Sequence, residues 1–183
     1  MRILIPLAHG VEEMEAVITI DMLRRCGIEA VTASIAGTRA VRGSRGIEIT
    51  ADALLAELDP ATFDALAIPG GKPGVDALRA DGRAAQLAKD FFTRGKLVAA
   101  ICAAPLILHD AGLLEGRAFT CHPAVASTLP PASSARVCAD GNLVTACGAG
   151  ATFAFALAIA ARLAGGETAR RAAQAACVLP EPC

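Results

Sequence analysis

One cysteine stands where a nucleophile would be exposed. Cys102 follows the apolar run Leu97–Ile101 and precedes Ala103, Ala104 and Pro105, small residues that open a helical pattern. A strand that turns sharply into a helix is the elbow that presents a nucleophile, and a helix N-terminus favours the thiolate form. A free cysteine is commonly a buried core residue instead, so both interpretations stand at this point.

A carboxyl group is the second candidate. Glu12, Glu13 and Glu15 open the first expected helix, where acidic side chains commonly face water and suit the helix dipole. That interpretation suits Glu12 and Glu13. Glu15 precedes the apolar Ala16-Val17-Ile18, which predicts a position on the sheet-facing side. A buried carboxyl has a raised pKa and can donate a proton to a thiolate or to a bound oxyanion.

Two further features could complete a site. Gly70 and Gly71 follow an apolar strand and Pro69, and their backbone amides, with the Ala103 amide, are expected to form an oxyanion hole. The alternative for this pair is an ordinary tight turn. His122 is a candidate proton shuttle near neutral pH, although a lone histidine in a loop is often incidental.

The elements that position these residues predict an α/β fold. Short apolar segments alternate with helical patterns, which indicates a mostly parallel sheet with helices on both faces. The expected strands are Arg2–Leu7, Ile28–Ala36, Phe63–Ile68, Leu97–Ile101, and Arg136–Cys138 with Leu143–Cys147 around a hairpin turn, with an extended stretch over Gly46–Ala51; the expected helices are 12–27, Gly82–Phe92, Pro105–Ala111, Ala151–Ala164 and Glu167–Cys177. Loops at the carboxyl ends of such strands meet in one crevice.

Length and composition narrow the function classes. The 183 residues predict one domain over 1–183, and an apolar fraction of 54% excludes a disordered chain. A net charge of −1 argues against a nucleic-acid partner or an anionic membrane surface. Apolar runs are strand-length, short of the roughly 20 residues that a bilayer span requires, and the N-terminus lacks a signal-peptide pattern.

The cysteines and glycines indicate neither a metal nor a phosphate site. Seven cysteines, an odd number without CxxC spacing, predict reduced thiols and a cytosolic location. Cys121, His122, Cys138 and Cys147 are too irregularly spaced for a metal site. Gly148 and Gly150 belong to neither a GxGxxG nor a GK[ST] signature, so they resemble a phosphate loop only superficially.

Four motifs together resemble the DJ-1/ThiJ/PfpI superfamily, in the branch of the parkinsonism-associated deglycase and its bacterial relatives. They are residues 9–15 (HGVEEME), 69–71 (PGG), 99–105 (AAICAAP) and 148–150 (GAG), in this order along a similarity that runs from Met1 to about Pro180. The resemblance implies a flavodoxin-like three-layer sandwich with a nucleophile elbow, a homodimer, and no required cofactor.

The same resemblance implies roles for individual residues. Cys102 matches an unusually acidic cysteine that oxidises to a sulfinic acid, and Glu15 a protonated glutamate bonded to it. Gly70 and Gly71 match the diglycine that lines the pocket, and His122 a histidine close by. Arg25 and Arg45 match arginines near the pocket and dimer interface. Ala103 replaces the histidine that follows the nucleophile in the protease-like branch, which argues against a peptidase.

Two hypotheses from different classes remain. In the first, the chain is a glutathione-independent glyoxalase that converts a small aldehyde, methylglyoxal, to lactate, or a deglycase that repairs early glycation adducts. In the second, Cys102 is a redox sensor in an oxidative-stress protein or chaperone, and it passes up the cysteine oxidation ladder. Both require a reactive Cys102. A Cys/His/Glu glutaminase is not expected, because no histidine follows His122.

Overall fold

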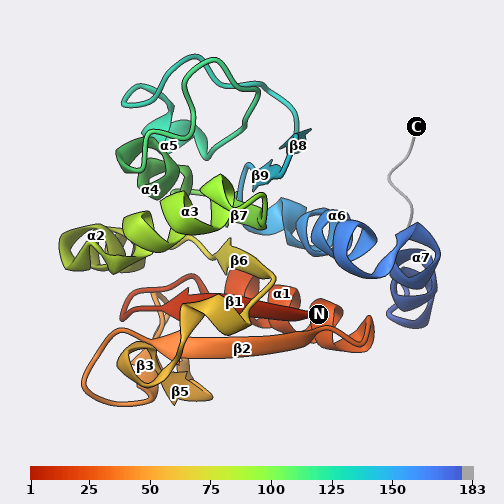
Figure 1. Cartoon of the computed structure of the whole chain (residues 1–183), viewed down its shortest axis with the longest axis horizontal. Coiled ribbons are helices and arrows are strands. Elements are labelled where there is room, and N and C mark those ends of the chain that lie inside the picture. Colours follow the sequence, from red (N-terminus) through yellow and green to blue (C-terminus); the bar gives the residue numbers. More distant parts are fainter. Residues whose placement is uncertain (179–183) are drawn as a thin grey trace.

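The computed structural model describes residues 1–178. A seven-stranded sheet has the strand order β5-β2-β1-β6-β7-β9-β8, in which every neighbouring pair is parallel except β8 and β9 (Figure 1). The strands are β1 (Arg2–Leu7), β2 (Glu29–Ser34), β5 (Ala53–Leu54), β6 (Ala65–Ile68), β7 (Leu97–Ile101), β8 (Val137–Asp140) and β9 (Leu143–Ala146). The mostly parallel sheet that the sequence predicts is therefore confirmed.

Helices cover both faces of this sheet. One face packs against α1 (Glu13–Arg25), α6 (Thr152–Ala164) and α7 (Gly166–Ala175); the other packs against α2 (Lys72–Asp81), α3 (Arg83–Thr93), α4 (Pro105–Asp110) and α5 (Pro123–Ala126). Three short 3-10 helices lie at Leu55–Glu57, Pro60–Thr62 and Ala149–Ala151. The three-layer sandwich is confirmed, and no helix within residues 1–178 has the length and apolarity that crossing a membrane would need.

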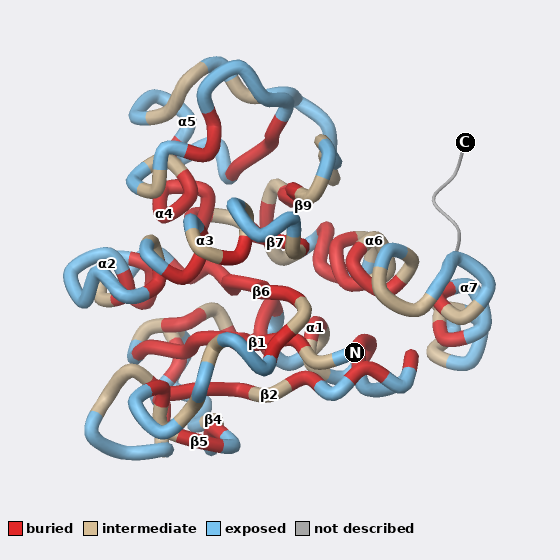
Figure 2. Tube along the Cα trace, viewed as in Figure 1, coloured by how far each residue is buried: buried red, intermediate tan, exposed pale blue. Residues whose placement is uncertain are grey.

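The central strands are apolar on both sides because both faces are covered. In β1, Ile3, Ile5 and Leu7 face the helices α1 and α6, while Leu4 faces the opposite layer. The same alternation runs through β7, and both strands appear as buried segments in the middle of the molecule (Figure 2). This burial fixes the strand ends, and so it fixes the loops that carry the candidate site.

A separate hairpin lies against the loop between β1 and α1. Its strands are β3 (Ala40–Arg42) and β4 (Glu48–Thr50). The backbone amide of Gly10 donates to the Arg42 carbonyl at 2.7 Å, and the Ser44 amide donates to the Val11 carbonyl at 2.8 Å. The extended stretch expected over Gly46–Ala51 is present as β4, and these bonds hold the hairpin beside the start of α1.

The sequence did not predict α2, and its first residues explain why. Lys72-Pro73-Gly74 continues the Gly/Pro-rich pattern after β6 and is typical of a turn. In the structure Pro73 lies in the first turn of α2, where a missing backbone N–H costs nothing. The helix packs Val75 and Leu78 into the core.

The strand order creates one crevice at the carboxyl ends of the strands. From β1 the chain proceeds to β2 on one side and later to β6 on the other. Loops that leave β1 and β6 in opposite directions open a gap between them, which is where ligands bind in open α/β sheets. The residues that follow β1, β6 and β7 are Glu15, Gly70-Gly71 and Cys102.

Candidate active site

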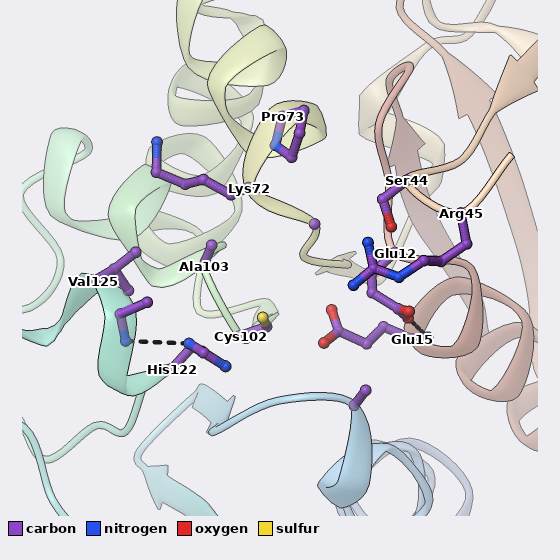
Figure 3. Close-up of a pocket in the computed structure, with 13 residues that line it drawn as sticks. Glu12, Glu15, Ser44, Arg45, Lys72, Pro73, Cys102, Ala103, His122 and Val125 are labelled. Atoms are coloured by element: carbon purple, nitrogen blue, oxygen red, sulfur yellow. Dashed lines mark hydrogen bonds between the residues drawn. The ribbon is translucent and has the colours of Figure 1, made fainter.

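A pocket of about 440 Å³ lies in this crevice, and residues from six segments line it. Figure 3 shows their side chains around the cavity. Cys102 and Ala103 follow β7, Glu15 comes from α1, and Gly71 precedes α2. Also lining the pocket are Glu12, Ser44, Arg45, Lys72, Pro73, His122, Ala124, Val125 and Ala149. The chain therefore brings together most of the residues that the sequence singled out.

Cys102 occupies the elbow that its sequence context predicts. Its φ is 64°, a left-handed conformation that side chains other than glycine rarely adopt and that costs about 1–3 kcal/mol. Two hydrogen bonds hold this turn: the Cys102 amide donates to the Ala146 carbonyl at 2.9 Å, and the His122 amide donates to the Cys102 carbonyl at 2.8 Å. The half-buried side chain points into the pocket (Figure 3).

Glu15 is fully buried on the sheet-facing side of α1, as expected. The Gly70 amide donates to its Oε2 at 2.8 Å, while within residues 1–178 Oε1 is buried without a hydrogen-bond partner. Burial raises the pKa of the Glu15 carboxyl to about 7, against the opposing effect of the Gly70 amide. At neutral pH the Glu15 carboxyl is therefore protonated in part of the molecules and ionised in the rest.

The pKa of Cys102 differs from the expectation. Burial and the adjacent charge of Glu15 raise the pKa of the thiol to about 12, and the amides of Gly71 and Ala103 act in the opposite direction. The sequence predicted a thiolate favoured by the helix N-terminus. In the structure, burial of the thiol and the charge of Glu15 act against that thiolate.

The three backbone amides that were expected to form the oxyanion hole do not all face the pocket. The amides of Gly71 and Ala103 face the Cys102 sulfur, whereas the Gly70 amide is occupied by Glu15. Gly70 is therefore not an oxyanion donor, which corrects the expectation for that residue. A Cβ at Gly70 would lie 2.5 Å from Glu15 Oε2 and 2.6 Å from Cys102 Cβ, so only glycine allows this close approach.

His122 lies on the exposed wall of the pocket. Its Nδ1 accepts a hydrogen bond from the Ala124 amide at 3.1 Å, so this nitrogen caps α5 (Figure 3). A neutral ring that accepts at Nδ1 carries its proton on Nε2. Its orientation makes His122 a donor toward the pocket and leaves Glu15 as the base nearest Cys102.

The two arginines lie in different places. Arg45 lines the pocket from the hairpin loop. Arg25 lies in the last turn of α1, where its Nε donates to Asp21 at 2.7 Å, and it is not a pocket residue. Of the two arginines expected near the pocket and dimer interface, Arg45 lines the pocket and Arg25 does not.

Comparisons with known proteins show which family this chain belongs to. The model of the family described as DJ-1/PfpI matches residues 1–162. The chain belongs to the DJ-1/PfpI family. It is 35% identical to a deglycase of Pyrococcus abyssi, over 79% of this chain and 89% of that protein. An oxidized DJ-1 from Toxoplasma gondii has 38% identity and a TM-score of 0.92, over 96% of this chain and 97% of that one.

Some relatives are much longer than this chain. DJ-1 homolog B of Arabidopsis thaliana is 37% identical over 99% of this chain, but the chain spans only 42% of that protein. The match with the family confirms the resemblance that the four sequence motifs carry, and the structural matches confirm the fold.

This DJ-1/PfpI pocket also contains residues that sequence reasoning missed. Glu12 caps α1, because its Oε2 accepts the Glu15 amide at 3.0 Å. Ser44 and Lys72 line the pocket from the hairpin and from α2. Glu13 was expected to face water, but it is 4% exposed and bonds to the hairpin. The position of Glu12 before a helix is a capping signal; no signal near Ser44 indicates the hairpin contact.

The remaining cysteines form no further site in the part of the chain that the structure covers. Over residues 1–178 no group of three His, Cys, Asp or Glu side chains has the geometry of a metal site. Cys26, Cys121, Cys138, Cys147 and Cys177 are free thiols, as is Cys102. Cys183 lies outside the described residues.

Proposed function

We propose that this DJ-1/PfpI chain converts small 2-oxoaldehydes to 2-hydroxy acids at Cys102, without glutathione or another cofactor. The observation that carries the proposal is the pairing of a half-buried thiol with Glu15, a buried carboxyl whose pKa is raised to about 7 by burial. Such a carboxyl can both remove and return a proton near neutral pH, and the reaction needs both steps.

The first step forms a hemithioacetal. As the Cys102 sulfur bonds to the aldehyde carbon of methylglyoxal, ionised Glu15 accepts the thiol proton and returns it to the aldehyde oxygen. A thiol whose pKa is about 12 needs such a base. The Gly71 and Ala103 amides that face the sulfur are suited to bind the oxyanion as it develops.

The second step is an internal redox transfer. Glu15 removes the proton from the former aldehyde carbon, which gives an enediol when the neighbouring carbonyl oxygen takes up a proton. Glu15 then delivers its proton to the neighbouring carbon as the hydroxyl on the first carbon loses its own, so the first carbon is oxidised and the second is reduced. The product is the thioester of a 2-hydroxy acid on Cys102. Water then cleaves the carbon–sulfur bond, which releases lactate and restores the thiol. No external oxidant or reductant is consumed.

A deglycase activity would use the same residues. A hemiaminal, as formed by an amine with methylglyoxal, presents Cys102 with the same two-carbon unit. The Pyrococcus abyssi relative named as a deglycase supports this extension.

Methylglyoxal consumption tests the proposal directly. The purified chain, without glutathione or added metal, is expected to produce lactate, and Cys102→Ser is expected to lose this activity because a hydroxyl is a far weaker nucleophile than a thiol. Lactate is measured enzymatically after removal of the protein. Cys177→Ser, which changes an exposed thiol away from the pocket, is the matched control. Equal turnover by Cys102→Ser would contradict the proposal.

A redox role is the second candidate. Cys102 is the cysteine among residues 1–178 that lines the pocket, and a similar solved structure is described as oxidized. Peroxide would first oxidise the sulfur to a sulfenic acid with release of water, and a second equivalent would give the sulfinic acid. The change would alter partner binding, or a chaperone-like activity, rather than turnover.

Peptide mass spectrometry after mild peroxide treatment distinguishes the redox role from the enzymatic one. We expect the addition of two oxygens at the peptide that contains Cys102 before any other cysteine is modified. Oxidation spread evenly over the cysteines would contradict a sensor. Absent lactate production combined with selective oxidation of Cys102 would favour the redox role over the enzyme.

We further propose a homodimer in the cytosol and one domain over residues 1–183. Met14 and Val17 expose 54% and 49% of their surface on α1, and Asp21 and Arg25 continue the same helix face. Phe153, on the neighbouring α6, is also exposed. A second copy covering this face would bury these apolar side chains; sedimentation velocity measures the mass. The free thiols suit a reducing compartment.

A further inference from the structure

A buried segment without regular secondary structure leads into the pocket. Residues 118–122, called the strap below, directly precede α5, and Phe119, Thr120 and Cys121 within it are buried. The last residue of the strap, His122, lines the pocket. Buried backbone outside a helix or a sheet needs a separate hydrogen-bond partner for each of its amides. The partners of the strap therefore show what fixes its position.

Two hydrogen bonds attach the inner half of the strap to the sheet. The Thr120 amide donates to the Oγ1 of Thr145 at 2.9 Å, and the His122 amide donates to the Cys102 carbonyl at 2.8 Å. Thr145 lies in β9 and is fully buried. Its hydroxyl takes the place that a main-chain carbonyl would have in a sheet. Because this acceptor is a side chain, a single substitution can remove it.

Strand β9 also holds the elbow directly. The Cys102 amide donates to the carbonyl of Ala146, the residue that follows Thr145. The N–H of Cys102 is thus bonded to β9, and its carbonyl is bonded to the strap, which is bonded to β9 in turn. These contacts close a ring around the elbow, and its members are Cys102, Ala146, Thr145, Thr120 and His122.

The elbow needs this support from outside. Cys102 has a φ of 64°, and a left-handed residue with a Cβ keeps that conformation only where its surroundings impose it. In this conformation the sulfur faces the amides of Gly71 and Ala103 and lies beside Glu15. A shift of the elbow would therefore separate the thiol from its oxyanion donors and from its base at the same time.

We infer that Thr145 is a positioning residue whose hydroxyl fixes the strap, and that the strap in turn fixes the left-handed elbow that presents Cys102 to the pocket. The inference rests on the proposed function only in taking Cys102 as the reacting group, and it applies equally to the redox role. Thr145 itself does not line the pocket. With valine at position 145 the Thr120 amide would be buried without this acceptor, so the strap would shift and weaken its bond to the Cys102 carbonyl.

Amide hydrogen exchange, measured residue by residue with NMR, tests this coupling without any turnover. Thr145→Val keeps the shape of the side chain and is expected to raise the exchange rates of the Thr120, His122 and Cys102 amides about tenfold relative to the amides of β1. The Ala118 amide, whose acceptor belongs to β8, should keep its rate. Faster exchange at Thr120 alone would overturn the inference, because the hydroxyl would then serve one amide without fixing the elbow.

Steady-state kinetics give the second readout. Thr145→Val is expected to lower kcat for methylglyoxal about tenfold and to leave KM within about twofold, because the thiol is displaced while the pocket walls remain. Thr145→Ser retains the hydroxyl and should restore both the exchange rates and most of kcat. Failure of serine to restore them would mean that the methyl group, not the hydrogen bond, matters, and it would overturn the inference.

Thr32→Val is the matched control for general destabilisation. Thr32 is also buried, and its hydroxyl donates to Asp52 Oδ2 at 2.8 Å and accepts the Asp52 amide at 2.8 Å, in β2 and away from the pocket. This variant should lose stability and leave kcat and the exchange of the strap unchanged. Equal effects of the two valine variants would overturn the inference. If the unaltered chain has no turnover, the exchange rates still decide the role of Thr145, since they require no catalysis.

Discussion

Replacing Glu15 with glutamine is expected to reduce the conversion of methylglyoxal to lactate by about 10²–10⁴-fold, the usual contribution of a positioned acid–base group. Glutamine keeps the size of the side chain, and its carbonyl oxygen can still accept the Gly70 amide that bonds to Oε2. It has no titratable proton, so it can neither take the thiol proton nor carry a proton between the two substrate carbons.

The same variant is expected to make Cys102 more reactive toward a neutral alkylating agent. The charge of Glu15 is one of the causes that raise the pKa of the thiol, and glutamine removes it. Iodoacetamide should therefore modify Cys102 several-fold faster in Glu15→Gln than in the unaltered chain at pH 8, where Glu15 is ionised. Full turnover in this variant, or slower alkylation, would contradict the role given to Glu15.

Glu15 also makes stability depend on pH. The pKa of its carboxyl is about 7 in the folded chain against 4.5 for an unperturbed group, so between these values the folded state holds a proton that the unfolded state releases. The contribution of Glu15 to the free energy of unfolding is thus fully present below about pH 4.5. It falls as the pH rises to 7, by on the order of 3 kcal/mol. In urea unfolding between pH 4.5 and 8, Glu15→Gln should lack this decrease.

Sequence patterns predicted the sheet and the elbow because both depend on local signals. The apolar runs of β1 and β7 are continuous, since each strand is buried on both faces, and Leu97–Ile101 is present with the expected bounds. Small residues after Cys102 indicated the turn. The burial of Glu15 followed from the apolar residues beside it on the helix.

The contacts across the chain were not predictable in the same way. Glu13 and Ser44 are 31 residues apart, and no periodicity indicates that the hairpin returns to α1. The first turn of a helix is normally solvated, so the rule that places acidic residues in water fails when another segment covers that turn. The pKa of Cys102 likewise depends on burial of the thiol and on the charge of Glu15, which come from the folded chain.

Gly71→Ala is expected to have the largest effect on stability among substitutions at the pocket. Gly71 has a φ of 88°, a left-handed conformation that costs a residue with a Cβ about 1–2 kcal/mol. A Cβ there would also overlap the Glu12 amide and the Gly10 carbonyl, which are backbone atoms of the loop before α1. Overpacking adds roughly 1–3 kcal/mol, because neither backbone atom can rotate away.

Gly82→Ala separates these two contributions. Gly82 lies between α2 and α3 with a φ of 79°, and a Cβ built there has no neighbouring atom within 4 Å. In urea unfolding, Gly82→Ala should therefore lose only the free energy that the left-handed backbone conformation costs a residue with a Cβ. Methylglyoxal turnover should remain. Gly71→Ala should cost roughly 1–3 kcal/mol more and should displace the amide that faces Cys102. Equal costs would mean that the loop before α1 yields to the added methyl group, and that this loop does not hold the Gly71 amide rigidly toward Cys102.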